Sequence, residues 1–123
     1  MTIRIQEKDF DLGAEIAALR KGDPRVGAVV SFLGTVRDMN EGSEIQELTL
    51  EHYAGMTEKA LEEILSQAKS RWDIYQALVI HRIGPLLPED QIVLVAALQH
   101  LQLFRTALQY FSALVFREHA ARM

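Results

Sequence analysis

The spacing of apolar and polar residues divides the chain into segments with the periods of strands and helices. Runs typical of strands cover residues 2–6, 26–36, 44–52, 75–83 and 91–97. The first and third of these alternate, as half-buried strands do, and a change of phase near Glu47 suggests a bulge. The polar connection at residues 40–43 predicts a hairpin between the second and third strands.

Three segments repeat their apolar residues with the period of a helix. Their bounds are Asp9 or Asp11 to about Lys21, residues 58–72 behind Thr57, and about Leu98 onward. Gly22 is expected to stop the first helix, and Glu58 favours the positive N-terminal end of the second. The third helix has an apolar stripe so broad that it predicts deep burial or contact with a partner.

The order of these elements predicts the fold class. Strands and helices follow one another as βαββαββα, which is typical of an α+β sandwich with a mixed or antiparallel sheet. With 123 residues, the chain suits one domain with one hydrophobic core. We therefore expect a single domain over residues 1–123.

Composition excludes several classes of protein. The net charge is −4 without a basic tract, so we expect no nucleic-acid partner. Cysteine is absent, which rules out disulfides, thiolate metal sites and cysteine nucleophiles, and the four histidines lack metal-ligand spacing. The apolar runs fall short of the roughly 18 residues of a membrane span, and the first ten residues show no leader. We expect a soluble cytoplasmic protein without a membrane partner.

Arg37 is the first candidate for chemistry. It is the only Lys or Arg between Arg25 and Lys59, an interval with six carboxylates, and it follows a buried strand. A guanidinium at a strand end can hold a phosphate or carboxylate through two parallel hydrogen bonds. The alternative is an exposed arginine paired with Asp38 or Glu41.

Other polar residues at strand ends have plain structural interpretations. His81 and Arg82 end an apolar strand, and we interpret them as a strand histidine and a surface charge. Tyr53 suits core packing as well as ligand contact. His100, placed at the start of the last helix, suits a neutral hydrogen-bonding role or a simple cap.

Three ordered blocks resemble a known family. They read GAVVSFLGTVRDMNEG, LTLEHYAGMTEKALEEI and VIHRIGPLLPEDQIVLVA, and they occur in the order found in the large, catalytic subunit of molybdopterin synthase. The resemblance covers roughly residues 2–97. It implies an α/β hammerhead fold and places Arg37 on the family arginine that lines the anionic substrate pocket.

The resemblance also implies an activity and partners. Members of this family convert cyclic pyranopterin monophosphate into molybdopterin, with its dithiolene. Sulfur arrives as a thiocarboxylate on the C-terminal tail of a small ubiquitin-like subunit. The large subunit is a homodimer within a heterotetramer, and sulfur transfer needs no metal or other cofactor.

The C-terminal segment departs from the family pattern. His100 can stand for the histidine of the family's His-Arg pair, but the two expected lysines are missing, since no lysine follows Lys69. Arg117 is the nearest cation to the second lysine and a candidate for anion binding, although a guanidinium cannot act as an amine nucleophile. Three explanations remain open. The chain is a paralogue that binds the partner but catalyses poorly, a synthase with a rearranged site, or an incomplete version of a full-length synthase.

Overall fold

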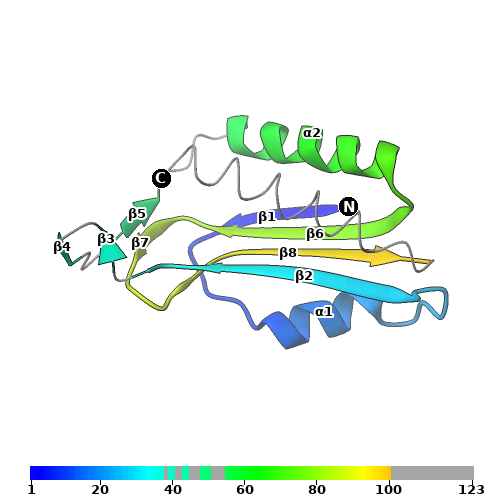
Figure 1. The fold of residues 1–123 in the computed structure, drawn as a ribbon, viewed down its shortest axis with the longest axis horizontal. Coiled ribbons are helices and arrows are strands. Elements are labelled where there is room, and N and C mark those ends of the chain that lie inside the picture. Colours follow the sequence, from blue (N-terminus) through cyan, green and yellow to red (C-terminus); the bar gives the residue numbers. More distant parts are fainter. Residues whose placement is uncertain (38, 41–42, 45–47, 51–54, 101–123) are drawn as a thin grey trace.

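A mixed sheet between two helices forms the body of the molecule (Figure 1). The computed structural model describes residues 1–37, 39–40, 43–44, 48–50 and 55–100. The helices and longer strands are β1 (Thr2–Gln6), α1 (Leu12–Arg20), β2 (Ala28–Thr35), α2 (Met56–Arg71), β6 (Ile74–Arg82) and β8 (Gln91–Gln99). The short strands are β3 (Met39–Asn40), β4 (Ser43–Glu44), β5 (Leu48–Leu50) and β7 (Gly84–Leu86).

The four long strands lie in the order β1-β6-β8-β2. β1 and β6 are parallel, whereas β8 is antiparallel to both β6 and β2. The predicted α+β class and mixed sheet are confirmed. β6 and β8 hold the centre because they are apolar on both faces, and such strands are stable only with a layer on each side.

The two helices cover opposite faces of the sheet (Figure 1). Side chains on successive strand positions point to opposite faces, so β6 and β8 supply both cores. Leu78, Ile80, Leu94 and Ala96 pack with α1, and Ala77, Val79, Val93 and Val95 pack with α2. Within the described ranges, no helix is long and apolar enough to cross a membrane.

Local capping fixes where the helices start. The Asp11 carboxylate accepts a hydrogen bond from the Ala14 backbone N–H at 2.8 Å, which selects Asp11 over Asp9 as the cap of α1. Gly55 precedes α2 with φ at 82°, a conformation that favours glycine. Glu58 accepts from the Gly55 N–H at 2.9 Å, which places it in the first turn as predicted. Thr57 lies inside α2 rather than before it.

Two predicted connections were wrong. β2 pairs with β8 instead of with the strand predicted at residues 44–52. Of the predicted hairpin, the described residues contain its tip, where β3 pairs with β4. The central strand β8 needs an apolar neighbour on each side, and β2 fills that position. The supposed turn at Gly84–Pro85 belongs to β7, which pairs with β5. Pro85 is tolerated because this pairing lies in a small two-stranded sheet.

The start of the third predicted helix was also wrong. Leu98 and Gln99 complete β8, and both are buried. Their pairing with Val29 and Ala28 continues the ladder of the preceding residues, so strand pairing outweighs the helical spacing of the sequence. The rest of that predicted helix lies outside the described residues.

Candidate functional site

Arg37 stands on a firmly anchored backbone. Its neighbour Val36 is 5% exposed, donates its N–H to the Asp90 carbonyl at 2.9 Å, and accepts from the Glu89 N–H at 2.9 Å. Arg37 itself is exposed, and among the described residues its guanidinium has no ion-pair partner. The alternative partners proposed for it, Asp38 and Glu41, lie outside the described residues. An exposed cation on a rigid base is suited to hold an anion from solution.

The strand that leads to Arg37 is bulged. The register of β2 against β8 shifts between Gly34 and Thr35. A Cβ on Gly34 would lie 2.9 Å from a methyl carbon of Val93, so glycine allows the two strands to approach here. A bulge re-aims the residues that follow it, which explains why the chain leaves the sheet just before Arg37.

Arg82, at the same end of the sheet, has a structural role. Its side chain is 12% exposed; Nε and Nη2 donate to the Glu7 carbonyl at 3.1 and 3.0 Å, and Nη1 donates to the Gln91 carbonyl at 3.0 Å. The interpretation of Arg82 as a surface charge was therefore wrong. Its donors are committed to the backbone because the loop after β1 needs an anchor on the sheet. Arg82 is thus unavailable to a ligand, whereas the Arg37 guanidinium is bonded to none of the described residues.

Gln91 ties the same loop to the start of β8. Its side-chain amide donates to the Asp9 carboxylate at 2.8 Å and to the Phe10 carbonyl at 2.6 Å. The hydrogen bond from Gln91 lowers the pKa of Asp9, and the Phe10 N–H and the Arg82 charge act in the same direction. Loop residues 7–10 are therefore fixed at the Arg37 end of the sheet.

His100 lies at the other end of the sheet, directly after β8. Its ring centroid is 4.4 Å from that of Tyr75, with the planes tilted by 39°. The Nε2 of His100 and the Oε1 of Gln99 are buried, and neither has a hydrogen-bond partner within the described ranges. Gly27 permits close approach here, since a Cβ on it would lie 2.6 Å from the His100 carbonyl oxygen.

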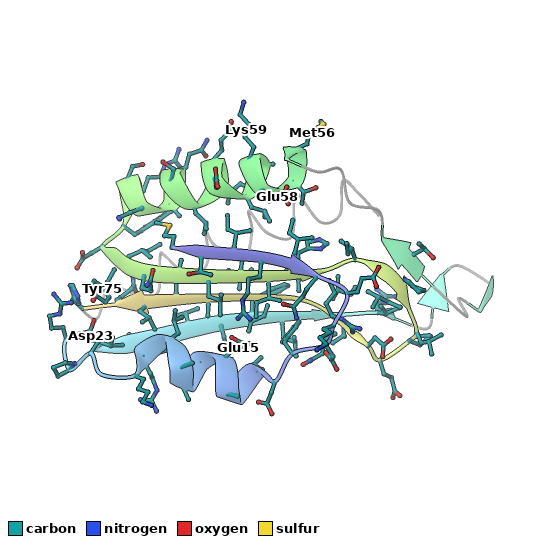
Figure 2. All side chains as sticks on the ribbon, turned by 180° about the vertical axis from the view of Figure 1, so that it is seen from behind. Glu15, Asp23, Met56, Glu58, Lys59 and Tyr75 are labelled. Atoms are coloured by element: carbon teal, nitrogen blue, oxygen red, sulfur yellow. The ribbon has the colours of Figure 1, made fainter. Side chains whose placement is uncertain are left out.

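A polar cluster that the sequence analysis missed adjoins His100 through Tyr75. Arg25 donates from Nε and Nη2 to the two Asp23 oxygens at 3.1 and 3.2 Å, and also to the Tyr75 hydroxyl. Its guanidinium carbon lies 4.6 Å from the Tyr75 ring centroid. Figure 2 shows Asp23 and Tyr75 together at one end of the sheet. The Asp-Pro-Arg turn is visible in the sequence, but Tyr75 is fifty residues away from Arg25, so only the fold brings them together.

Electrostatics within this cluster favour the ion pair. The Arg25 guanidinium, helped by the Tyr75 hydroxyl, lowers the pKa of Asp23. The neighbouring Asp23 carboxylate raises the pKa of Tyr75. Arg25 therefore carries its own counter-ion, whereas the described residues offer none to Arg37.

The predicted site residues do not gather in one place. Arg37 lies beside the start of β8 and His100 beyond its end, and nine strand residues at about 3.4 Å each separate them by roughly 30 Å. One small ligand cannot touch both residues of the same chain. Arg117 lies outside the described residues.

The mixed sheet with a helix on each face and the presented arginine define an α+β protein with a candidate anion site. Comparison with known proteins then identifies the family. The family model described as "MoaE protein" matches residues 5–102, and the chain belongs to this family. The resemblance found in the three sequence blocks is thereby confirmed.

Individual relatives and structures agree with this assignment. A protein of Ralstonia nicotianae named "Molybdopterin synthase catalytic subunit" is 70% identical over 95 residues, which are 77% of this chain and 54% of the relative. The MoaE protein structure from Burkholderia ambifaria is 47% identical with a TM-score of 0.78, covering 90% of this chain and 73% of that one. The molybdopterin synthase structure from Staphylococcus aureus is 28% identical with a TM-score of 0.77, covering 89% and 80%.

The match does not extend over the whole of the curated relatives. This chain spans 54% of the Ralstonia protein and 61% of the Vibrio cholerae protein of the same name, to which it is 52% identical over 93 residues. Arg37 lies within the matched family region, and Arg117 lies beyond it.

Proposed function

We propose that the chain is a sulfur-transferring subunit of molybdopterin synthase. Sulfur passes from the thiocarboxylated C-terminus of a small ubiquitin-like subunit to cyclic pyranopterin monophosphate and forms the dithiolene of molybdopterin. The observation that carries this proposal is Arg37, an exposed arginine on an anchored strand end in a chain 70% identical to a protein named as this catalytic subunit.

Arg37 binds the phosphate of the precursor in this proposal. Its guanidinium offers two parallel N–H donors, and among the described residues no carboxylate neutralises it. The cyclic phosphate supplies the matching pair of acceptor oxygens. His100 is the second proposed substrate contact and Arg117 the third; His100 cannot reach the ligand held by Arg37 of its own chain.

Amine chemistry in this chain is limited to few groups. The four lysines are Lys8, Lys21, Lys59 and Lys69, and all four are exposed. Of these, Lys8 belongs to the loop that Arg82 and Gln91 fix at the Arg37 end of the sheet. If the chain turns over through an amine, we propose Lys8 as the first lysine to test.

A second candidate function is a binding module for the small ubiquitin-like subunit. The absence of any lysine after Lys69 favours it, because an arginine cannot form the covalent adducts that an amine forms. In this case Arg37 still holds an anion, but no dithiolene product accumulates.

The partners follow from either candidate. We propose a homodimer of this chain within a heterotetramer that contains two small subunits, without nucleic acid, membrane or metal. We also propose a cytoplasmic location, which fits a chain without cysteine.

One assay separates the two candidates. The purified chain is mixed with thiocarboxylated small subunit and pterin precursor, and dithiolene product is followed while calorimetry measures binding of the small subunit. Product formation supports the enzyme; binding without product supports the module. Neither binding nor product would refute both.

Matched variants sharpen this assay. Lys8→Arg keeps the charge and removes the amine, and Lys59→Arg on α2 is its control. Loss of product with Lys8→Arg and its retention with Lys59→Arg would identify Lys8 as the reacting amine. Equal rates of product formation in the two variants would rule Lys8 out.

A further inference from the structure

The outer strand β1 leaves one side of its backbone open. It stands at one end of the strand order β1-β6-β8-β2, and among the described strands it pairs only with β6. Its sequence, TIRIQ, contains no proline, the residue that would interrupt a ladder of hydrogen bonds. Such an edge presents N–H and C=O groups to which an extended peptide can add as a further strand.

The one charged side chain of β1 does not protect this edge. Successive side chains of a strand point to opposite faces of the sheet, and Arg4 points to the α1 face, where its guanidinium is paired with the Glu15 carboxylate. Ile3 points to the other face and packs with the core beneath α2. On the α2 face, β1 therefore presents only the apolar side chains of Ile3 and Ile5.

A cavity of about 340 Å³ lies between β1 and the helix α2. Its apolar lining comes from Met1, Ile3 and Leu65, and its polar lining from Glu58, Glu62, Ser66 and Lys69. The volume lies within the range of ligand pockets, which is about 300–1,000 Å³. Because Met1 and Ile3 bring the cavity to the open backbone of β1, we call the cavity and this backbone together the β1–α2 groove.

Charges of opposite sign lie at the two ends of the groove. α2 is followed directly by β6, which is parallel to β1, so α2 runs antiparallel to β1 (Figure 1). Lys69 therefore lies toward the start of β1 and Glu62 further toward its end. Both are exposed, and neither has an ion-pair partner among the described residues.

The other glutamate of the groove is already in use. Glu58 accepts a hydrogen bond from the Gly55 N–H at 2.9 Å, and Figure 2 shows it on the side of α2 that faces the sheet, whereas Lys59 points away. Glu62 is therefore the carboxylate of the groove that we assign to a ligand cation, and Lys69 is the cation that we assign to a ligand anion.

The spacing of these charges suits an extended peptide. Seven helical residues at about 1.5 Å each place Glu62 and Lys69 roughly 10 Å apart along α2. In a strand, residues on one face recur every second position, about 7 Å apart, so three of them span about 14 Å. The long flexible stem of Lys69 covers the difference. A basic residue can thus face Glu62 and an acidic residue Lys69, with an apolar side chain between them in the cavity.

We propose that the β1–α2 groove binds an extended peptide segment of another protein, which pairs antiparallel with β1. In N-to-C order, the segment carries a basic residue that faces Glu62, an apolar residue in the cavity and an acidic residue that faces Lys69, with one residue between each. Antiparallel pairing is the more stable arrangement per residue. β1 itself contains no acidic residue, so β1 of a second copy does not match. This inference does not rest on the proposed function.

Two synthetic peptides that differ only in the order of their charges test the match. The forward peptide reads TKTLTET and the reversed peptide TETLTKT, and both are acetylated and amidated so that their ends carry no charge. In calorimetry, the forward peptide is expected to bind about tenfold more tightly, because reversal makes both antiparallel charge pairs repulsive.

Each other result of this titration would overturn part of the proposal. Tighter binding of the reversed peptide would overturn the antiparallel direction, since this peptide matches the charges when it runs parallel to β1. Equal affinities would overturn the assignment of the charges. No saturable binding of either peptide up to about 1 mM would overturn the groove as a peptide site.

An exchange of the two charges on the protein gives an independent test. The double variant Glu62→Lys with Lys69→Glu should prefer the reversed peptide by about tenfold. Both side chains are exposed, so the fold should persist. Glu63→Lys, at an exposed residue of α2 outside the cavity lining, is the control and should keep the preference for the forward peptide. An unchanged preference in the double variant would overturn the contact with α2.

N-methylation of the forward peptide tests the backbone pairing. Methyl groups on the N–H groups of the lysine, leucine and glutamate block one edge of the peptide, and methyl groups on those of the threonines block the other. One of the two methylated peptides should bind at least about tenfold more weakly than the second, because only one edge bonds to β1. Equal affinities of the two would overturn strand addition.

Binding of the small ubiquitin-like subunit separates this inference from the proposed function. The groove lies at the β1 edge of the sheet, whereas Arg37 follows β2 at the opposite edge. The double charge variant should therefore bind the small subunit as tightly as the parent does. Loss of this binding would place the groove within the small-subunit interface and overturn a separate partner. Peptide binding by a chain that binds no small subunit would refute the proposed function alone.

Discussion

The two ends of the central sheet use their arginines in opposite ways. At one end the Arg82 side chain is only 12% exposed and is bonded to backbone carbonyls, while Arg37 at the same end is exposed and has no counter-ion among the described residues. At the other end Arg25 is paired with Asp23 and rests on Tyr75. The difference shows that charge alone does not mark a binding residue. An arginine can bind a ligand when its N–H donors are not already bonded to other groups of the protein.

The largest effect is expected for Arg82, because its side chain holds the loop after β1 on the sheet. Arg82→Ala removes three hydrogen bonds to the Glu7 and Gln91 carbonyls and should lower the free energy of unfolding by about 2–4 kcal/mol. Urea denaturation measures this loss. Arg82→Lys should restore only part of it, because one ammonium cannot reproduce the planar fork. A change below about 0.5 kcal/mol would contradict the contrast between Arg82 and Arg37.

Arg37 should show the reverse behaviour. Arg37→Ala is expected to weaken binding of the pterin precursor by roughly 1.5–3 kcal/mol, the scale of a charge-assisted hydrogen bond. Its free energy of unfolding should change by less than about 0.5 kcal/mol, since the side chain is exposed. Calorimetry and urea denaturation give the two values. An unchanged dissociation constant would remove Arg37 from the site.

Acid titration compares the carboxylates of the two ends. The pKa of Asp9 and of Asp23 is lowered in the folded state, by Gln91 and Arg25 respectively. A depressed pKa contributes stability above the unfolded value, near 4, and this contribution is lost as the pH falls below it. The free energy of unfolding, measured between pH 6 and 2, should therefore fall less steeply with decreasing pH in Asp23→Asn and in Asp9→Asn than in the parent.

The Asp23 variant should show the weaker pH dependence of the two. The pKa of Asp23 is lowered more than that of Asp9, and the cause is a bidentate ion pair with Arg25. Asp73→Asn, a carboxylate outside both clusters, serves as the control. If the free energy of unfolding of Asp23→Asn and of the parent fell equally with decreasing pH, the Asp23–Arg25 pair would not persist in solution.

The smallest effect is expected at the turn that holds the backbone of Arg37. Glu89 has φ at 78°, a left-handed conformation that is costly for a side chain with a Cβ. Glu89→Gly should change the free energy of unfolding by less than about 1 kcal/mol, because relief of strain offsets the greater entropy of the unfolded chain. Glu89→Val should be about 1 kcal/mol less stable than Glu89→Gly. Thermal unfolding compares the two variants. Equal melting temperatures would show that residue 89 does not hold a left-handed conformation in solution.

Most of the elements could be predicted from local patterns. The strand at residues 2–6 has the predicted bounds, and α1 begins after one of the two predicted caps. The pairing of β2 was missed because it depends on β8, more than fifty residues later, and not on the nearby turn. The end of β8 was missed because a strand ladder continued through residues with helical spacing. Spacing reports local preference, whereas pairing depends on distant partners.

The sequence by itself determined the periods of the elements, the absence of thiol chemistry, and the lone arginine that follows a buried strand. The tertiary structure decided that Arg82 is committed to the backbone, that Arg25 joins Tyr75, and that Arg37 and His100 are far apart. The physical reason is that hydrogen bonds and ion pairs depend on distances of a few ångströms between residues far apart in the chain. Such distances exist only after the sheet has set its strand order and register.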